Sequence, residues 1–202
     1  MQIQDYQTNE LIYESVNSSV YRAVRKLDGL PVILNVLKGD YPSPIELIRY
    51  KQEYELVRHL KVAGVIKAFG LEKAQNTLVI ILEDFLGDSL RNLLNCYQFT
   101  LNECLTIADS LGQIHAKNII HKDINPANII YRPQTGQLKI IDFGISTQLS
   151  RQHFTLKTPS TLEGTLAYIS PEQTGRMNRS LDYRSDFYSL GGHALPRKES
   201  II

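Results

Sequence analysis

Two short polar segments in the second half of the chain hold residue types suited to phosphoryl transfer. The first is His-Lys-Asp-Ile-Asn-Pro-Ala-Asn at 121–128, and the second is Asp-Phe-Gly at 142–144. Phosphoryl transfer needs a carboxylate that orients the attacking hydroxyl and oxygen ligands that hold Mg²⁺ against the phosphates. Asp123 could supply the carboxylate, and Asn128 and Asp142 the metal ligands. Each tripeptide alone could be an ordinary turn, but their order, flanked by apolar strand residues, favours a catalytic site.

A short β-hairpin is expected to bring the two metal-ligand candidates face to face. Two β-prone runs, Asn128–Tyr131 and Leu138–Ile141, flank the turn signal Pro-Gln-Thr-Gly at 133–136. Because Asn128 begins one run and Asp142 follows the other, antiparallel pairing would place them at the same end of the hairpin.

A helix is expected just before these segments. Thr100 and Glu103 form a capping box, a pattern typical of a helix start. Apolar residues then recur at helical spacing and predict a single buried face: Leu101, Cys104, Leu105, Ala108, Leu111 and Ile114.

The first third of the chain predicts a five-stranded antiparallel sheet with one helix. The β-prone runs are Leu11–Tyr13, Val20–Val24, Pro31–Leu37, Val65–Phe69 and Thr77–Leu82. A capping box at 43–46, with Pro44 at the first helical position, predicts a helix that ends near 63–64. Its expected apolar face consists of Ile45, Ile48, Leu56 and Leu60.

Composition excludes several classes of protein. The 202 residues are 43% hydrophobic and 21% charged, with a net charge of +1, which suits an ordinary globular domain and gives no electrostatic reason to expect nucleic acid or a membrane surface as partner. Cys96 and Cys104 show no CxxC spacing, so neither zinc nor a disulfide framework is expected. The longest apolar run, Leu78–Leu82, is too short to span a membrane, and a cytoplasmic location is expected.

The segment 121–144 resembles the catalytic and metal-binding loops of protein kinases. The resemblance continues at 164–172, Gly-Thr-Leu-Ala-Tyr-Ile-Ser-Pro-Glu, which is similar to the end of an activation loop, and at 185–191, similar to the buried helix that supports the catalytic loop. The sequences of 121–126 and 170–179 are similar to those found in the kinase modules at the start of large bacterial hybrid signalling proteins. In those proteins an ATPase-like region, a GAF sensor domain and often a histidine kinase follow the kinase module.

This resemblance implies a eukaryotic-type serine/threonine kinase with a bilobal α+β fold. It implies a small antiparallel β lobe with one helix at 1–82, a hinge at 83–87, an incomplete helical lobe at 88–191 and an aberrant tail at 192–202. The implied reaction is ATP-dependent phosphotransfer to Ser or Thr of a protein substrate in signalling. The implied cofactors are ATP and Mg²⁺, with downstream sensor domains in the parent design.

The resemblance also assigns roles to individual residues. Asp123 would be catalytic, and Asn128 and Asp142 would bind the metal. His121, Glu172 and Asp186 would give structural support, with Asp186 anchoring the catalytic-loop backbone, and Thr165 would lie in the activation loop. The implied ATP-binding residues are Val20, Ile33, Asn35, Glu53, Glu83 and Phe85.

Two departures from the kinase pattern affect the phosphate contacts. Asn35 stands where the family holds a lysine, so Glu53 would lose its cationic partner and the phosphates a positive charge. Lys38 follows three residues later, where strand alternation directs it to the opposite face. Tyr13, Ser15 and Ser18 replace the glycines of the phosphate-covering loop, which predicts a loose hold on nucleotide.

The end of the chain departs as well. Gly191 and Gly192, with Pro196 shortly after, are expected to stop the central helix. The helices that complete the large lobe in the family do not follow, which predicts a C-terminal truncation caused by a frameshift or deletion near Gly191.

Two other functions fit the sequence. A pseudokinase or degenerate fragment that acts as a binding module is favoured by Asn35, the lost glycines and the lost tail. A small-molecule phosphotransferase can use a similar His-x-Asp arrangement with a later Asp. The Ser-Pro-Glu segment at 170–172, which would close a long activation-type loop, argues against that third interpretation.

Overall fold

The computed structural model describes residues 3–39, 41–93, 100–149, 164–174 and 180–194. The chain forms two compact units. Unit 1 comprises Met1–Lys61 and Ile66–Leu86, and unit 2 comprises Val62–Val65 and Gly87–Ile202. The predicted α+β fold with an antiparallel sheet is confirmed.

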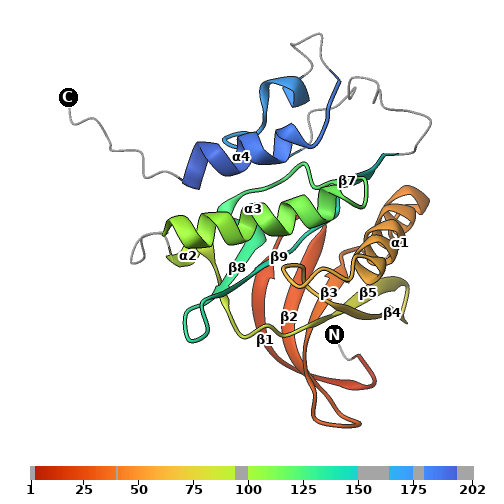
Figure 1. The fold of residues 1–202 in the computed structure, drawn as a ribbon. Coiled ribbons are helices and arrows are strands. Elements are labelled where there is room, and N and C mark those ends of the chain that lie inside the picture. The colour runs from red at the N-terminus through yellow and green to blue at the C-terminus, as the bar shows by residue number, and fades with distance from the viewer. Residues whose placement is uncertain (1–2, 40, 94–99, 150–163, 175–179, 195–202) are drawn as a thin grey trace, which may run out of the picture. The chain divides into compact units, whose positions relative to one another are not determined.

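Unit 1 is built on a five-stranded antiparallel sheet in the order β1-β2-β3-β5-β4 (Figure 1). The strands are β1 (Tyr6–Glu14), β2 (Ser18–Arg25), β3 (Pro31–Leu37), β4 (Ala68–Ala74) and β5 (Thr77–Glu83). The predicted bounds of the fourth strand, 65–69, are wrong. Val65 belongs instead to unit 2, where its N–H closes a tight turn onto the Val62 carbonyl (3.1 Å) and where it forms an isolated parallel bridge with Ile140.

The helix of unit 1, α1 (Pro44–His59), begins at the predicted capping box. Ser43 Oγ accepts from the Glu46 N–H (3.3 Å), and a Glu46 carboxylate oxygen accepts from the Ser43 N–H (2.8 Å). Hydrogen bonding of the Glu46 carboxyl to the side chain and to the backbone N–H of Ser43 holds its pKa below the ordinary value. The helix ends at His59, earlier than predicted, because the N–H of Leu60 bonds to the Val57 carbonyl and tightens the last turn.

The predicted buried face of α1 is wrong in its first two turns. Ile45 and Ile48 are exposed, whereas Tyr50, Tyr54 and Val57 are buried. Tyr50 and Tyr54 form a core cluster with Leu37 on β3 and with Leu78 and Ile80 on β5. The long aromatic side chains reach this core from a helix face that an aliphatic pattern does not mark.

The two faces of the sheet carry two separate cores. Val32, Leu34 and Val36 of β3 lie in one cluster, with Val79 and Ile81 of β5. Because successive side chains of a strand point to opposite faces, Ile33 and Asn35 lie on the other face, which α1 covers.

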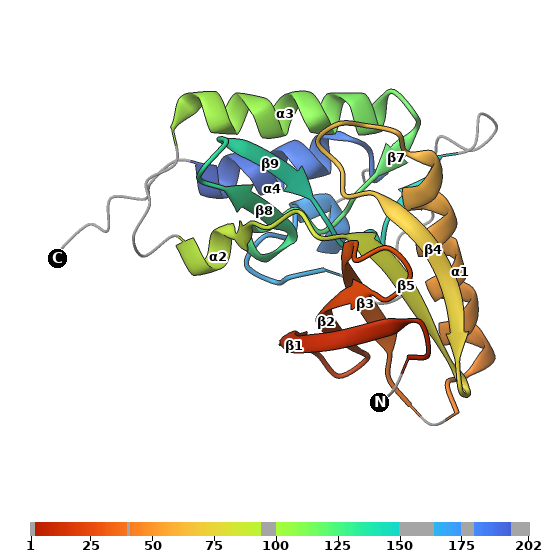
Figure 2. The ribbon, with the colours of Figure 1, turned by 90° about the horizontal axis from the view of Figure 1, so that it is seen from below.

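Unit 2 combines two main helices with small sheets (Figure 2). Helix α3 (Leu101–His115) packs against α4 (Arg184–Ala194) and β9. A three-stranded sheet has the order β6-β8-β9, and β7 pairs with β10. The short elements are β6 (Asp88–Ser89), α2 (Leu90–Leu93), β7 (Ile119–Ile120), η1 (Pro126–Asn128), β8 (Ile129–Arg132), β9 (Gln137–Ile140), β10 (Thr147–Gln148) and η2 (Pro171–Thr174).

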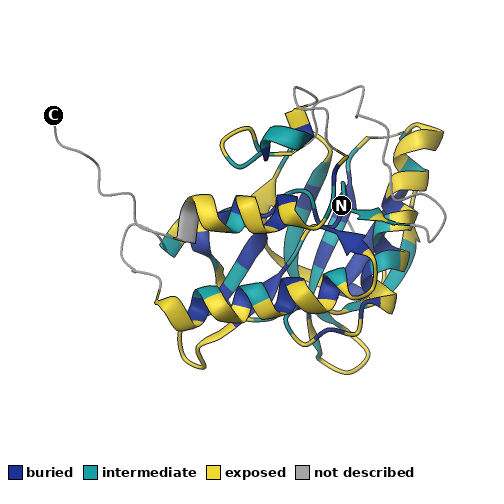
Figure 3. Ribbon diagram, turned by 45° about the horizontal axis from the view of Figure 1, so that its top comes forward, coloured by how far each residue is buried: buried dark blue, intermediate teal, exposed yellow. Residues whose placement is uncertain are grey.

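Helix α3 begins at the predicted capping box, with reciprocal bonds between Thr100 and Glu103. Its predicted face is only partly right, because Leu101 and Leu105 are exposed and Ile107 is buried together with Leu111 and Ile114 (Figure 3). The buried residues follow the face that meets β7, β9 and α4. No helix within the described ranges is long and apolar enough to cross a membrane.

The predicted helix stop at Gly191 and Gly192 is wrong, because α4 continues through both glycines to Ala194. A glycine in a helix costs about 1 kcal/mol relative to alanine, which weakens a helix but does not forbid it. Pro196 and the rest of the predicted tail beyond Ala194 lie outside the described residues.

A close approach at Gly64 joins two parts of unit 2. The Gly64 carbonyl accepts from the Ile140 N–H (2.8 Å), and a Cβ added at Gly64 would lie 1.9 Å from Ser110 Oγ and 2.6 Å from Ser110 Cβ. Only glycine fits between α3 and β9 at this point.

We therefore expect Gly64→Ala to lower the free energy of unfolding by about 1–3 kcal/mol, because the bonded backbone cannot withdraw. Urea unfolding measures this. The matched control is Gly112→Ala on the exposed side of α3, where an added Cβ meets nothing within 4 Å. That variant should gain up to about 1 kcal/mol. An unfolding midpoint for Gly64→Ala equal to that of the unmodified chain would contradict the close packing.

Candidate functional site

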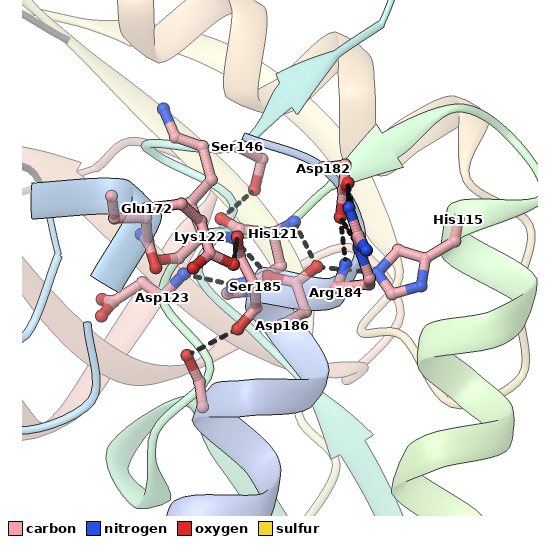
Figure 4. A network of polar contacts seen from close by, with 12 residues as sticks. His115, His121, Lys122, Asp123, Ser146, Glu172, Asp182, Arg184, Ser185 and Asp186 are labelled. Carbon is pink, nitrogen blue, oxygen red and sulfur yellow. Dashed lines mark hydrogen bonds and ion pairs between the residues drawn. The ribbon is translucent and has the colours of Figure 1, made fainter. Parts of the chain in front are cut away.

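A buried carboxylate, Asp186, is the anchor of the polar network in unit 2 (Figure 4). One of its oxygens accepts from the Lys122 N–H (2.8 Å), and the other from the His121 N–H (2.9 Å) and from His115 Nε2 (2.8 Å). Asp186 is 0% exposed, so these three hydrogen bonds replace the hydration that its charged carboxylate loses on burial. The sequence pattern assigned no part in the site to His115, which comes from the last turn of α3.

His121 is fully buried, and both of its ring nitrogens have partners inside the site. Nε2 lies 3.1 Å from the Ile141 carbonyl and must donate to it, so Nδ1 is the acceptor for the Asp123 N–H (3.3 Å). The ring packs edge-on against Phe143, with centroids 4.6 Å apart. This use of both nitrogens leaves neither available for proton transfer and supports the structural role predicted for His121.

The Asp123 carboxylate is fixed by two neutral donors. One oxygen accepts from the Thr165 N–H (2.9 Å), and the other from Asn128 Nδ2 (3.0 Å). Asn128 Nδ2 also donates to the Asp123 carbonyl (2.9 Å), which orients the amide with its nitrogen toward Asp123. The amide oxygen of Asn128 is thereby the end directed away from Asp123, as a metal ligand requires.

Asn125 joins this group, although the sequence pattern did not assign it a site role. It is buried, and its Nδ2 donates to the Asp123 carbonyl and to Thr165 Oγ1, both at 3.2 Å. Its Oδ1 accepts from the Ala127 N–H (2.8 Å), so it caps η1. The Asn-Pro dipeptide, an N-cap residue followed by proline at the first helical position, is the signal that predicts this cap.

The β8–β9 hairpin forms as predicted and brings Asn128 close to Asp142. Ile129 pairs with Ile140, and the Ile141 N–H donates to the Asn128 carbonyl (2.9 Å). Asp142 follows with φ at 63°, and its carboxylate accepts from the Gly144 N–H (3.2 Å). The exposed Asp142 thus stands beside the buried Asn128 at the open end of the hairpin.

The donor set at this hairpin end fits Mg²⁺ in its chemistry. It offers one carboxylate and one amide oxygen, and among the described residues no group of three or more His, Cys, Asp and Glu side chains could hold a metal. Mg²⁺ is commonly held by one or two protein oxygens, with the remaining ligands supplied by phosphates and water.

The segment at 164–174 is attached to α4 by two serines. Ser185 Oγ donates to the Glu172 carboxylate (3.0 Å), and Ser189 Oγ donates to the Tyr168 carbonyl (2.7 Å). Both serines are buried and lie on the same helix as Asp186. The helix that anchors the loop at 121–128 therefore also anchors this segment, a role for Ser185 and Ser189 that the sequence pattern missed.

The residues predicted to bind ATP all lie in unit 1. Val20 on β2 and Asn35 on β3 are direct partners in the sheet register, and Ile33 lies two residues before Asn35 on the same face. Glu53 lies on α1, Glu83 is the last residue of β5, and Phe85 follows shortly after.

Asn35 does not supply the positive charge that a lysine would bring to a phosphate contact. Its Oδ1 is buried without a hydrogen-bond partner, while its backbone carbonyl accepts from the Tyr50 hydroxyl (2.6 Å). The NH₂ group of the same amide could donate to a phosphate oxygen, but the side chain adds no positive charge. This position fits a bound nucleotide less well than a lysine does.

The turn between β1 and β2 satisfies its own backbone donors. The N–H groups of Asn17 and Ser18 donate to Ser15 Oγ, and the Ser15 N–H donates to the Ser18 carbonyl. Lys38 reaches the same turn, where it donates to the Ser15 carbonyl (2.6 Å) and pairs with Glu14 (2.8 Å), which lowers the pKa of the Glu14 carboxyl. Backbone donors that a glycine-rich loop would offer to phosphate are engaged within the turn.

We expect Asp186→Asn to lower the free energy of unfolding by about 1.5–3 kcal/mol, because an amide cannot accept all three hydrogen bonds and leaves buried donors unpaired. Urea unfolding measures the loss. Asp182→Asn is the control: Asp182 pairs with Arg184 at the surface and precedes α4, where asparagine caps equally well, so a change within about 0.5 kcal/mol is expected. Equal stability of both variants would contradict the anchoring role.

Known proteins resemble the chain along almost its whole length. The profile described as "Protein kinase domain" matches residues 6–195. A probable serine/threonine-protein kinase of Clostridium perfringens is 28% identical over 193 residues, which cover 92% of this chain and 27% of that protein. Serine/threonine-protein kinase PknA of Mycobacterium tuberculosis is 29% identical over 197 residues, which cover 92% of this chain and 44% of PknA. The chain thus spans less than half of these relatives, and it belongs to the protein kinase domain family.

Proposed function

We propose that the chain transfers the γ-phosphoryl group of ATP to a serine or threonine hydroxyl of a protein substrate in signalling. The observation that carries the proposal is the geometry of Asp123, whose two carboxylate oxygens are held by Thr165 and Asn128 on a loop anchored by buried Asp186. Family membership and the names of the serine/threonine kinase relatives support the same reaction.

In this proposal Asp123 accepts the hydrogen bond of the attacking hydroxyl and so aims its oxygen at the phosphorus. The donors from Thr165 and Asn128 occupy one position on each carboxylate oxygen, and each oxygen has a second lone pair for the substrate. The Asn128 amide oxygen and the Asp142 carboxylate would hold Mg²⁺. Bound Mg²⁺ supplies the charge that neutralises the phosphate oxygens.

The pseudokinase interpretation is a second candidate with its own support. The unpartnered Asn35 oxygen and the self-bonded turn at 15–18 weaken two phosphate contacts in unit 1. A chain with this pattern would bind nucleotide poorly and act through partners.

The proposal for this chain also includes a cytoplasmic location and a parent protein with downstream sensor domains.

The test that separates the two candidates measures Mg-ATP binding by calorimetry and phosphate transfer to dephosphorylated casein. Asp123→Asn should retain binding but lose transfer by about a hundredfold or more, because the hydroxyl is no longer oriented by a carboxylate. Asp142→Ala should lose the Mg²⁺ dependence of binding. Asp109→Ala, an exposed aspartate on α3, is the control and should behave like the unmodified chain. Absence of both binding and transfer in the unmodified chain would reject the kinase proposal and favour the pseudokinase.

Asn35→Lys should increase Mg-ATP affinity by about tenfold, because a cation replaces an unpartnered acceptor next to the phosphates. Asn35→Met, which removes the amide without adding charge, separates the two effects. Equal gains from both variants would show that the buried amide, and not the missing charge, limits binding. No gain from Asn35→Lys would contradict the placement of position 35 at the phosphates.

A further inference from the structure

The peptide that links Lys122 to Asp123 is held in an unfavourable backbone conformation. Lys122 has φ at 71°, in the left-handed region, which is sterically unfavourable for a residue with a Cβ. Such a conformation persists only when neighbouring groups hold it. The Lys122 N–H is held by Asp186, and the Lys122 carbonyl accepts from Gln173 Nε2 at 2.8 Å.

Both the oxygen and the nitrogen of the Gln173 side-chain amide form hydrogen bonds at this contact. It is 5% exposed within η2, and its Oε1 accepts from both the N–H and the Oγ of Ser170, each at 3.1 Å. Ser170 is itself fully buried. Because two donors fix the amide oxygen, the nitrogen must face Lys122, so the side chain has one orientation.

This contact lies directly beside the catalytic carboxylate. The same peptide unit is held on its nitrogen side, where the Asp123 N–H donates to His121 Nδ1 (3.3 Å). Gly164 packs against it, since a Cβ there would lie 3.2 Å from the Lys122 carbonyl oxygen. Two of the hydrogen bonds between the segment at 164–174 and the catalytic loop bear on Asp123: Thr165 holds the Asp123 carboxylate, and Gln173 holds the peptide that carries it.

We propose that Gln173 is a positioning residue for phosphoryl transfer: its amide locks the Lys122–Asp123 peptide and so sets the direction of the Asp123 carboxylate. The proposal rests on the function proposed above. It gives the segment before α4 a direct effect on the catalytic rate, in addition to its attachment to α4 through Ser185 and Ser189.

Gln173→Glu tests this role with a change of one atom. Glutamate keeps the acceptor for Ser170 but places an oxygen against the Lys122 carbonyl, so the peptide loses its donor. We expect kcat for transfer from Mg-ATP to dephosphorylated casein to fall at least about tenfold, with KM for Mg-ATP unchanged within about twofold. Thr174→Ala breaks the bond from Thr174 Oγ1 to the Pro171 carbonyl (2.6 Å) in the same turn and should leave kcat unchanged.

Hydrogen exchange of the amides at 121–124 is the readout independent of activity. Exchange there should be faster in Gln173→Glu and unchanged in Thr174→Ala. If Gln173→Glu does not fold, Gln173→Met, which keeps the length without the amide, replaces it. If the unmodified chain transfers no phosphate, the kinase proposal fails, and exchange alone then decides whether Gln173 holds the loop. A kcat and an exchange rate both within about twofold of the unmodified chain, or equal effects from Thr174→Ala, would overturn the role of Gln173.

Discussion

The buried carboxylate of Asp186 is the constraint on which the functional half of this protein depends. A charge removed from water is tolerated only if hydrogen bonds replace its hydration. Here the replacements are two consecutive backbone N–H groups of the catalytic loop and one histidine of α3. The solvation requirement of one side chain on α4 therefore fixes the loop and α3 together.

The catalytic loop proposed here turns directly after these two bonds. The N–H groups of His121 and Lys122 converge on the Asp186 carboxylate, and the chain then turns at Lys122, whose φ lies in the left-handed region. The turn leaves the Lys122 carbonyl directed toward Gln173 and the Asp123 side chain directed toward Thr165. Support for the carboxylate thus comes from rigid elements and from a segment far along the chain, which is the arrangement that a precisely placed catalytic group needs.

The two units differ in how well their residues suit the proposed phosphoryl transfer. In unit 2 Asp123, Asn128 and His121 all have partners suited to their proposed roles. In unit 1 the position of the expected lysine holds a buried acceptor without a partner, and the phosphate-covering turn bonds to itself. The groups proposed to orient a hydroxyl are well held, whereas the groups proposed to attract phosphate are reduced.

Local features of the fold could be predicted from sequence. Capping boxes at 43–46 and 100–103 and the hairpin around 133–136 depend on residues a few positions apart, so their patterns are visible in one dimension. The order of polar motifs was likewise enough to select the family.

Contacts between distant residues were decided only by the tertiary structure. Periodicity placed Ile45 and Leu101 on buried faces, yet both are exposed because the faces of α1 and α3 are set by what packs against them. His115 meets Asp186, Gln173 meets Lys122, and Gly64 meets Ser110 across long stretches of chain. The spacing of residues along the chain does not predict such pairs, because each contact depends on how separate helices and strands pack together. The sequence by itself determined the family, because its motifs are local, and the packing of α3, α4 and the hairpin determined how the polar groups of the candidate site are held.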